Sequence, residues 1–250
     1  MDMMYLICPS KMPMPVIIWI HGGGWRSGTK KDGKKKIIPF ALRGYFCVSI
    51  NYRLSFEAPF PAQLEDCKCA VRFLRANANE LNLNPRKIGV WGSSSGGHLA
   101  ALLGTTQHMK EFDKSGPWRS SSSKVQAVCD WFGPTDFLRM NSYPSEIDHD
   151  AYDSPESELI GYPIQSAVDK VALANPITHI TSSVPPFLIM HADNDLLVPL
   201  NQSQILYESL SQAGNEVTFE VIHGGGHGKK FSSPGILNMV EIFFSNHLEE

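Results

Sequence analysis

The sequence has no long hydrophobic run. Its longest apolar stretch, Val16–Ile20, is far shorter than the roughly 20 residues that a membrane-spanning helix needs. The N-terminus also lacks a basic region followed by an apolar stretch, which is the pattern of a signal peptide. The chain as it stands therefore predicts a cytoplasmic protein without a membrane span. A protein from which a signal peptide had been removed would instead be periplasmic or secreted.

Cysteine is scarce and irregularly placed. The chain has five cysteines, an odd number, and their spacing matches no disulfide framework, so reduced thiols are predicted. Cys67 and Cys69 are too close in sequence to hold zinc by themselves, and no second Cys or His pair accompanies them. Neither a disulfide scaffold nor a structural zinc site is expected.

An excess of positive charge is also missing. The net charge is −3, so no nucleic-acid partner is expected. The one basic cluster, within Lys30–Lys36, is interpreted as a solvated surface segment. With 250 residues, of which 42% are hydrophobic and 19% charged, the chain fits one globular domain with a sizeable core.

Short hydrophobic runs alternate with amphipathic segments along the chain. The predicted strands are Val16–Ile20, Tyr45–Tyr52, Lys87–Trp91, Val125–Trp131, Phe187–His191 and Val217–Ile222. The predicted helices are Lys34–Leu42, Ala62–Ala76, Ser95–Leu103, Gln202–Ala213 and Ile236–Leu248. Because the strands are continuously hydrophobic, they predict an α/β fold with a mainly parallel sheet and helices on both faces.

No repeat or linker divides the chain, so residues 1–250 are predicted to form a single domain. The stretch 139–174 is polar and contains several prolines. Loops of that length in compact domains are usually functional or mobile. We therefore interpret residues 139–174 as a candidate cover segment over the site.

Three consecutive serines, Ser93, Ser94 and Ser95, connect a predicted strand to a predicted helix. In this context the pattern G-x-S-x-G indicates a nucleophile elbow, whose strained central serine lifts its hydroxyl clear of the sheet. Strand and helix pass so closely there that the residues two before and two after the serine must be very small. Only Ser94 has glycine at both positions, Gly92 and Gly96, which makes it the candidate nucleophile.

An attacking serine needs a base, and the base needs a carboxylate to orient it. The last two predicted strands are followed by loops that contain Asp193 and Asp195, and His223 and His227. These loops leave the carboxyl ends of parallel strands, where such sheets place their sites. We favour His227, because three glycines before it let the backbone arch over the sheet, and Asp195, because an apolar run follows it. His223 is interpreted as a strand-end residue and Asp193 as a turn residue.

The segment His21–Trp25 contains three glycines directly after the first predicted strand. Bare backbone N–H groups there can face a small cavity and stabilise an oxyanion. We predict Gly23 and Gly24 as donors, joined by the N–H of Ser95. Nucleotide-binding alternatives fail on spacing, because a phosphate loop would need lysine before threonine, and a dinucleotide turn would need glycine in place of Ser27.

With these elements placed, the sequence resembles the α/β-hydrolase superfamily, and within it the small bacterial esterases related to hormone-sensitive lipase. The residues that carry the resemblance are His21–Trp25, Gly92–Gly97, the Asp195 loop and His223–Gly228. Further motifs resemble a bacterial subgroup assigned to feruloyl and acetyl-xylan esterases, namely Asn51–Leu54, Phe60–Gln63, Asp130–Asp136 and Asp153–Ser157. The resemblance extends from about residue 2 to the C-terminus.

The sequence departs from that family in two places. Relatives of hormone-sensitive lipase usually carry aspartate at the position of Ser93 and alanine at that of Ser95, but position 95 contributes only its backbone. They also have one or two antiparallel strands and a cap before the glycine loop, and Met1–Met14 leaves room for only one short strand around Met3–Cys8. We therefore predict about seven strands, a truncated N-terminus with a minimal cap, and a fairly open cleft.

These features predict a serine carboxylesterase that hydrolyses short-chain acyl esters through an acyl-enzyme. Ser94 is the expected nucleophile, His227 the general base, and Asp195 the acid that orients the imidazole. No metal or organic cofactor is expected. A metal site at His223 and His227 would need a helix, which the intervening glycines disfavour.

The resemblance implies small esters or acylated carbohydrates as substrates, with acetyl or feruloyl groups of plant polysaccharide as examples. Trp25 and Trp131 are candidate substrate contacts, with a place in the core as the alternative. Two other function classes stay open: an aminopeptidase of the prolyl-oligopeptidase type, and a non-enzymatic binding protein on a hydrolase scaffold. The chain is expected to be a monomer or a homodimer.

Overall fold

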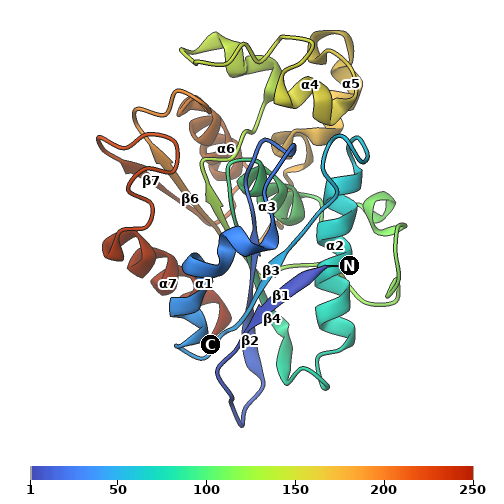
Figure 1. Ribbon diagram of the computed structural model, residues 1–250, viewed down its shortest axis with the longest axis vertical. Helices are drawn as coiled ribbons and strands as arrows, with labels where there is room; N and C mark the ends of the chain where they lie inside the picture. The colour runs from blue at the N-terminus through green and yellow to red at the C-terminus, as the bar shows by residue number, and fades with distance from the viewer. Residues whose placement is uncertain (1, 250) are drawn as a thin grey trace.

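Seven strands form one sheet through the middle of the molecule, in the order β1-β3-β2-β4-β5-β6-β7 (Figure 1). The computed structural model describes residues 2–249. The strands are β1 (Met3–Leu6), β2 (Met14–Ile20), β3 (Phe46–Ile50), β4 (Leu83–Ser93), β5 (Ala127–Trp131), β6 (Phe187–Ala192) and β7 (Val217–Ile222). β1 pairs antiparallel with β3, and the other pairings are parallel. The predicted seven-stranded, mainly parallel sheet is thus confirmed.

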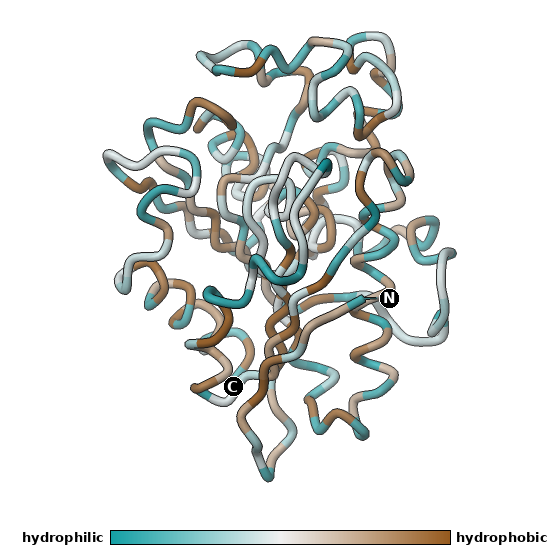
Figure 2. The backbone as a smooth tube through the Cα atoms, viewed as in Figure 1, coloured by the Kyte–Doolittle hydropathy of each residue, from teal (hydrophilic) through white to brown (hydrophobic). Residues whose placement is uncertain are grey.

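The inner strands are buried on both faces. Every residue of β3, β5 and β6 is buried. A strand between two layers of helices needs hydrophobic side chains at successive positions rather than at alternate ones. Figure 2 shows the corresponding concentration of hydrophobic residues in the strands at the centre of the molecule.

Helices cover both faces of the sheet. One face carries α2 (Ala62–Ala76), α3 (Ser95–Thr105) and α6 (Asn201–Gln212), and the other carries α1 (Lys34–Ala41) and α7 (Pro234–Leu248). These five helices begin and end within two residues of the predicted bounds. In the part of the chain that the structure describes, no helix has both the length and the hydrophobicity needed to cross a membrane.

The parallel register brings the carboxyl ends of the strands to one edge of the sheet. Ser93 of β4 lies opposite Trp131 of β5, and Ala192 of β6 lies opposite Ile222 of β7. The loops that follow these strands therefore all start at the same edge. The residues that the sequence analysis selects for chemistry lie in these loops or at their ends.

Residues 139–174 rise above this carboxyl edge, at the top of Figure 1. They include two short helices, α4 (Pro155–Ile160) and α5 (Val168–Ala174). His98 of α3 donates its Nε2 hydrogen to the carbonyl oxygen of Ala174 at 2.7 Å. On the other side, Arg26 forms an ion pair with Glu158 at 2.7 Å. The segment is therefore attached both to the central helix and to the loop after β2.

Strand β4 and helix α3 approach each other closely where they meet. A Cβ atom at Gly92 would overlap the carbonyl group of Gly96, and one at Gly96 would overlap the carbonyl oxygens of Ile20 and His21. These obstructing atoms belong to the backbone, so no change of rotamer relieves the overlap. Glycine at both positions is what allows the strand to continue directly into the helix.

We expect Gly96→Ala to lower the free energy of unfolding by at least about 1–3 kcal/mol, because the added methyl group must push α3 away from β2. Gly235→Ala in α7 is the matched control. A Cβ there meets no atom within 4 Å, so the change should raise stability by up to about 1 kcal/mol. Urea unfolding of both variants measures the difference, and equal stabilities would contradict the packing constraint.

Candidate active site

Ser94 lies in the turn between β4 and α3 with a left-handed backbone, φ 54° and ψ −125°. Residues other than glycine rarely adopt this conformation. Two backbone hydrogen bonds hold it, because Ser94 N–H donates to the Trp131 carbonyl at 2.8 Å and His98 N–H donates to the Ser94 carbonyl at 3.0 Å. The strand, strained turn and helix together have the geometry of a nucleophile elbow.

A continuous chain of hydrogen bonds connects three residues that are far apart in sequence. His227 Nε2 lies 3.1 Å from Ser94 Oγ, and His227 Nδ1 lies 2.8 Å from Asp195 Oδ2. An ionised carboxylate only accepts hydrogen bonds, so Nδ1 carries the hydrogen of the neutral ring. Nε2 is then left unprotonated and accepts the hydroxyl hydrogen of Ser94.

The carboxylate of Asp195 is fixed on several sides. Its Oδ1 accepts hydrogen bonds from the backbone N–H groups of Leu197 at 2.9 Å and Val198 at 3.0 Å. His191 Nε2 lies 3.4 Å from Oδ2. Burial alone would raise the pKa of Asp195, but the hydrogen bonds from His191 and His227 outweigh it and hold the pKa well below its usual range. The acid therefore stays ionised at neutral pH.

The two residues that the sequence analysis rejected pair with each other. His223 Nδ1 lies 2.9 Å from Asp193 Oδ2, and Gly224 N–H donates to Asp193 Oδ1 at 2.8 Å. The His223 side chain is 85% exposed. This surface pair has the strand-end and turn character that was predicted, and neither residue joins the chain of hydrogen bonds at Ser94.

The glycine loop after β2 faces the same space as Ser94. Gly23 and Gly24 have φ values of 120° and 60°, which glycine adopts without strain. Within residues 2–249 their amide N–H groups donate to no other protein atom. The N–H of Ser95 opens helix α3 directly beside the nucleophile. All three residues line one cavity with Ser94, as expected for donors to an oxyanion.

Tyr52 connects the two sides of this arrangement, and the sequence analysis assigned it no role. Its hydroxyl donates to the His21 carbonyl at 3.0 Å and lies 3.3 Å from Ser95 Oγ. Its ring also stacks on the His21 ring at 4.3 Å. Tyr52 thus ties the start of the glycine loop to the start of α3.

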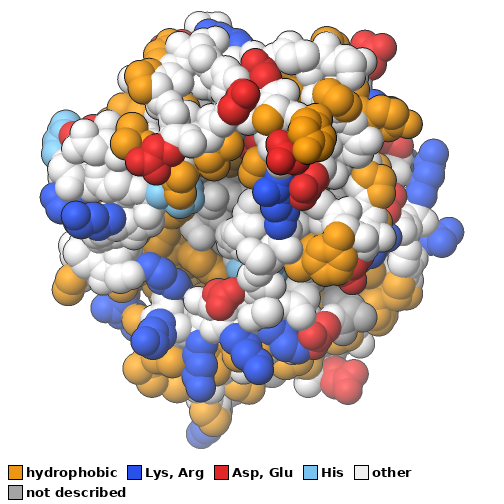
Figure 3. Space-filling model, turned by 45° about the horizontal axis from the view of Figure 1, so that its top comes forward, with side chains coloured by type: hydrophobic (Ala, Val, Ile, Leu, Met, Phe, Trp, Pro, Cys, Tyr) orange, Lys and Arg blue, Asp and Glu red, His pale blue; other side chains and the backbone are white. Residues whose placement is uncertain are grey.

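The cavity at Ser94 has a volume of about 460 Å³. Figure 3 shows the hollow on this face of the molecule. Phe132 forms part of the wall, with its ring centroid 4.7 Å from that of His227. The other lining residues come from the glycine loop, the elbow, the loop after β5, the acid and base loops and the segment 139–174: Gly22, Gly23, Gly24, Trp25, Ser93, Ser94, Ser95, Pro134, Ile147, His149, Pro155, Glu156, Leu197, Val198, His227 and Gly228.

Trp131 does not contact this cavity, which corrects the prediction of a substrate contact. Its side chain is 1% exposed and packs against Trp91 and Phe231 in the core that α1 and α7 cover. Trp131 is the last residue of β5 and points into the core beneath the sheet edge, whereas Phe132 follows the strand with a positive φ of 45°. Phe132, the next residue, reaches the cavity instead. Trp25 does line the cavity, but it is 1% exposed and packs mainly on His98 and Phe137.

His149 and Glu156 also line the cavity, and the sequence analysis missed both. Each is almost fully buried, and His149 Nδ1 lies 3.0 Å from Glu156 Oε2, which is a hydrogen-bonding distance. Glu156 belongs to the Asp153–Ser157 motif, which the sequence analysis used only to support a resemblance. Nothing in the local sequence indicates that this carboxylate points inward.

A larger cavity of about 640 Å³ lies elsewhere, and its lining includes Asn51, Arg53 and Trp118. The guanidinium of Arg53 is already paired with Asp66 at 2.9 Å. We place the candidate site in the smaller cavity because that cavity contains the nucleophile and its base. Among residues 2–249, no three His, Cys, Asp or Glu side chains are grouped so that they could hold a metal ion.

Asp130 lies under the elbow and is fully buried. Its Oδ1 accepts a hydrogen bond from Gly133 N–H at 3.0 Å, while Oδ2 has no partner among the described residues. Burial raises the pKa of Asp130 to about 7, although the hydrogen bond from Gly133 opposes the shift. Below that pH the folded protein therefore contains a neutral carboxylic acid beside α3.

Comparison with known proteins identifies relatives along most of the chain. The family model described as BD-FAE matches residues 1–210. LipM of Mycobacterium tuberculosis, a probable carboxylic ester hydrolase, is 30% identical over 205 residues, which are 81% of this chain and 46% of LipM. The chain spans about half the length of the curated relatives it matches.

Two solved structures are similar over nearly the whole chain. A truncated form of a carbohydrate esterase from gut microbiota has a TM-score of 0.91 and 34% identity, with 96% of this chain and 88% of that chain covered. The bifunctional GH43-CE protein of Bacteroides eggerthii has a TM-score of 0.89 and 35% identity, with 95% and 34% covered. These similarities confirm the resemblance and the fold that the sequence motifs indicate.

Asp130→Asn should reveal the buried acid through the pH dependence of stability. The folded state keeps the Asp130 proton up to a pH of about 7, whereas the unfolded chain releases it near pH 4. As the pH rises from 4 to 7, the free energy of unfolding of the wild type should therefore fall relative to that of the variant by about 1.4 kcal/mol per pH unit. Above pH 7 the difference between the two proteins should be constant. Urea unfolding between pH 4 and 8 measures it. A difference that does not change with pH would contradict the shift.

Proposed function

The chain belongs to the BD-FAE family, and from that premise we propose that it is a serine carboxylesterase that hydrolyses short-chain acyl esters. The observation that carries the proposal is the hydrogen-bonded chain from Ser94 Oγ through the His227 ring to Asp195, with distances of 3.1 and 2.8 Å. The cavity beside it also holds amide donors that have no partner among the residues that the structure describes. A nucleophile, a base and an oxyanion site in one place are what acyl transfer needs.

In the proposed reaction Ser94 attacks the ester carbonyl carbon while His227 Nε2 takes the hydroxyl proton. Asp195 stabilises the imidazolium that forms and keeps the ring oriented. The tetrahedral intermediate collapses when His227 returns the proton to the departing alcohol. Water then attacks the acyl-enzyme, with His227 again as base, and the acid product leaves.

We assign the stabilisation of the negative charge that develops on the carbonyl oxygen to hydrogen bonds from the N–H groups of Gly23, Gly24 and Ser95. The positive φ values of the two glycines keep side chains out of the space that the oxyanion would occupy. Donors that are already in place need no reorganisation during the reaction, and each typically contributes about 10²–10³ in kcat.

The proposed substrates are esters with a short acyl group on a carbohydrate. A cavity of about 460 Å³ is at the small end for ligand sites. The solved structure with 34% identity is named as a carbohydrate esterase. Acetyl groups on plant polysaccharide fit both observations, and feruloyl groups are the larger alternative.

Ser94→Ala should reduce kcat/KM for p-nitrophenyl acetate by about 10⁴-fold or more, because the variant has no nucleophile. A circular-dichroism spectrum equal to that of the wild type checks that the variant is folded. An amino-acyl p-nitroanilide should not be hydrolysed by the wild type. Full esterase activity in folded Ser94→Ala protein would end the proposal.

The paired acids and histidines allow matched substitutions. Asp195→Asn and His227→Gln should each lower kcat by roughly 10³-fold or more, since the first no longer favours the required tautomer and the second removes the base. Asp193→Asn and His223→Gln make the same chemical changes in the surface pair and should keep wild-type kcat. Steady-state kinetics on p-nitrophenyl acetate compares the four variants. Equal losses in both pairs would contradict the assignment of roles.

A further inference from the structure

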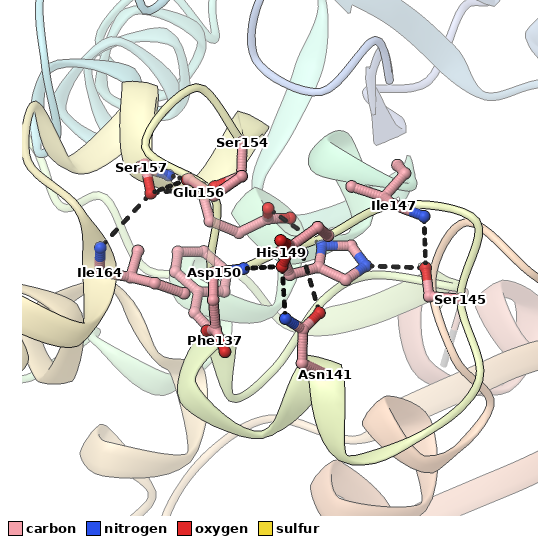
Figure 4. Close-up of polar contacts among 12 residues, drawn as sticks. Phe137, Asn141, Ser145, Ile147, His149, Asp150, Ser154, Glu156, Ser157 and Ile164 are labelled. Atoms are coloured by element: carbon pink, nitrogen blue, oxygen red, sulfur yellow. Dashed lines mark hydrogen bonds and ion pairs between the residues drawn. The ribbon is translucent and has the colours of Figure 1, made fainter.

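The wall of the Ser94 cavity contains a buried acid and base that the proposed reaction does not use. His149 and the Glu156 carboxylate are joined at 3.0 Å, and their side chains are 1% and 3% exposed (Figure 4). Both residues come from the segment 139–174 and line the same cavity as Ser94. A buried polar pair in a cavity wall calls for a physical explanation.

The hydrogen positions on His149 follow from its partners. Ser145 Oγ donates its only hydrogen to the Leu196 carbonyl at 3.0 Å and accepts one from Ile147 N–H at 3.1 Å. His149 Nε2, which lies 3.1 Å from Ser145 Oγ, must therefore be the donor in that contact. The remaining shared proton lies between His149 Nδ1 and Glu156 Oε2. The pair as a whole carries no net charge.

The second carboxylate oxygen of Glu156 is left without a donor. Oε2 is used by His149, and within residues 2–249 no group donates to Oε1. This oxygen is not fully enclosed by protein atoms, and Glu156 lines the Ser94 cavity, so Oε1 can be reached from the cavity. It can therefore accept a hydrogen bond from an O–H or N–H group of a ligand at this place.

We propose that Glu156, held in place by His149, is a subsite that accepts a hydrogen bond from a hydroxyl group in the alcohol portion of the substrate. The proposal rests on the proposed esterase function and deepens it, because it names the residue that would recognise a free hydroxyl group next to the ester in a carbohydrate substrate. In a short acyl ester the acyl group has no hydrogen to donate, so the donor must come from the alcohol portion.

A neutral hydroxyl suits this subsite better than a cationic amine. The imidazole of His149 already balances the Glu156 carboxylate, and Asp195 is saturated by its own donors. A buried amine would therefore lose its hydration without meeting an uncompensated charge. A hydroxyl group loses less hydration and needs only the one acceptor.

The subsite lies close to the reacting groups. A Cβ placed on Gly24 would be 3.5 Å from the Cβ of Pro155, the residue before Glu156. The start of α4 therefore packs directly on the glycine loop that we assign to the oxyanion. Ser154 fixes this start, because its Oγ accepts a hydrogen bond from Ser157 N–H at 3.0 Å.

Three acetates that share one ring test the proposal: trans-2-hydroxycyclohexyl acetate, its 2-methoxy ether and cyclohexyl acetate. The wild type should prefer the hydroxy ester over the other two by roughly 10- to 100-fold in kcat/KM, which is the effect of one hydrogen bond to a charged group. A hydroxy-to-methoxy ratio near one would overturn the subsite. So would hydrolysis of p-nitrophenyl acetate without hydrolysis of the hydroxy ester.

Glu156→Gln should lower the hydroxy-to-methoxy ratio to a few-fold. His149 Nε2 keeps its hydrogen on Ser145, so Nδ1 of the neutral ring accepts a hydrogen bond from the glutamine NH₂ group. The glutamine carbonyl oxygen then faces the cavity as a neutral acceptor, and its hydrogen bond is weaker than that of a carboxylate. Glu158→Gln, on the exposed side of the same helix, is the matched control and should keep the wild-type ratio. Equal loss on all three esters in Glu156→Gln would show that the pair only anchors the segment, and would overturn the subsite.

Two further results distinguish a failure of the subsite from a failure of the proposed esterase function. Hydrolysis of these esters by Ser94→Ala would disprove the catalytic role of Ser94, whatever the ratio. Ser94-dependent hydrolysis with a ratio near one would leave the esterase intact and disprove only the subsite. If Glu156→Gln does not fold, the wild-type ratio alone decides the outcome.

Discussion

The close backbone contact between Gly96 and the end of β2 is the constraint on which the site depends. It lets helix α3 start directly over the sheet, with the carbonyl oxygens of Ile20 and His21 against the Gly96 Cα. Ser94 connects β4 to the helix in that position with a positive φ of 54°. The strain at Ser94 is held by backbone hydrogen bonds to the neighbouring strand and helix. The same contact sets the N–H of Ser95 beside the glycine loop, so nucleophile and oxyanion donors are positioned together.

The acid and base reach this elbow because β6 and β7 are adjacent parallel strands in register. Their loops leave the same edge, so residues 32 positions apart meet at 2.8 Å. Asp195 can orient His227 because its other oxygen is fully used by two backbone N–H groups. A carboxylate held in this way cannot rotate, and the direction it imposes on the imidazole is passed on to Ser94.

Much of this arrangement follows from sequence, because it depends on local rules. Glycine at 92 and 96 selects Ser94, and parallel strands place the loops with Asp195 and His227 at one edge.

What could not be predicted depends on how distant segments pack. Trp131 and Phe132 are adjacent aromatic residues at the end of a strand, and the backbone turn at Phe132, which has a positive φ, brings only the second one to the cavity. Glu156 and Tyr52 act through contacts with residues 7 and 31 or more positions away, for which no short-range signal exists.

The His149–Glu156 pair argues for selection by a ligand rather than for anchoring alone. Burying an acid and a base removes both from water, and a well-packed apolar pair of similar volume often gives equal or greater stability. The segment 139–174 already has other attachments, through Arg26 to Glu158 and through His98 to Ala174. The polar connection also runs through Ser145 to Leu196, the neighbour of Asp195. Hydrogen bonds through His149 and Ser145 therefore connect the proposed subsite to the loop that carries the catalytic acid.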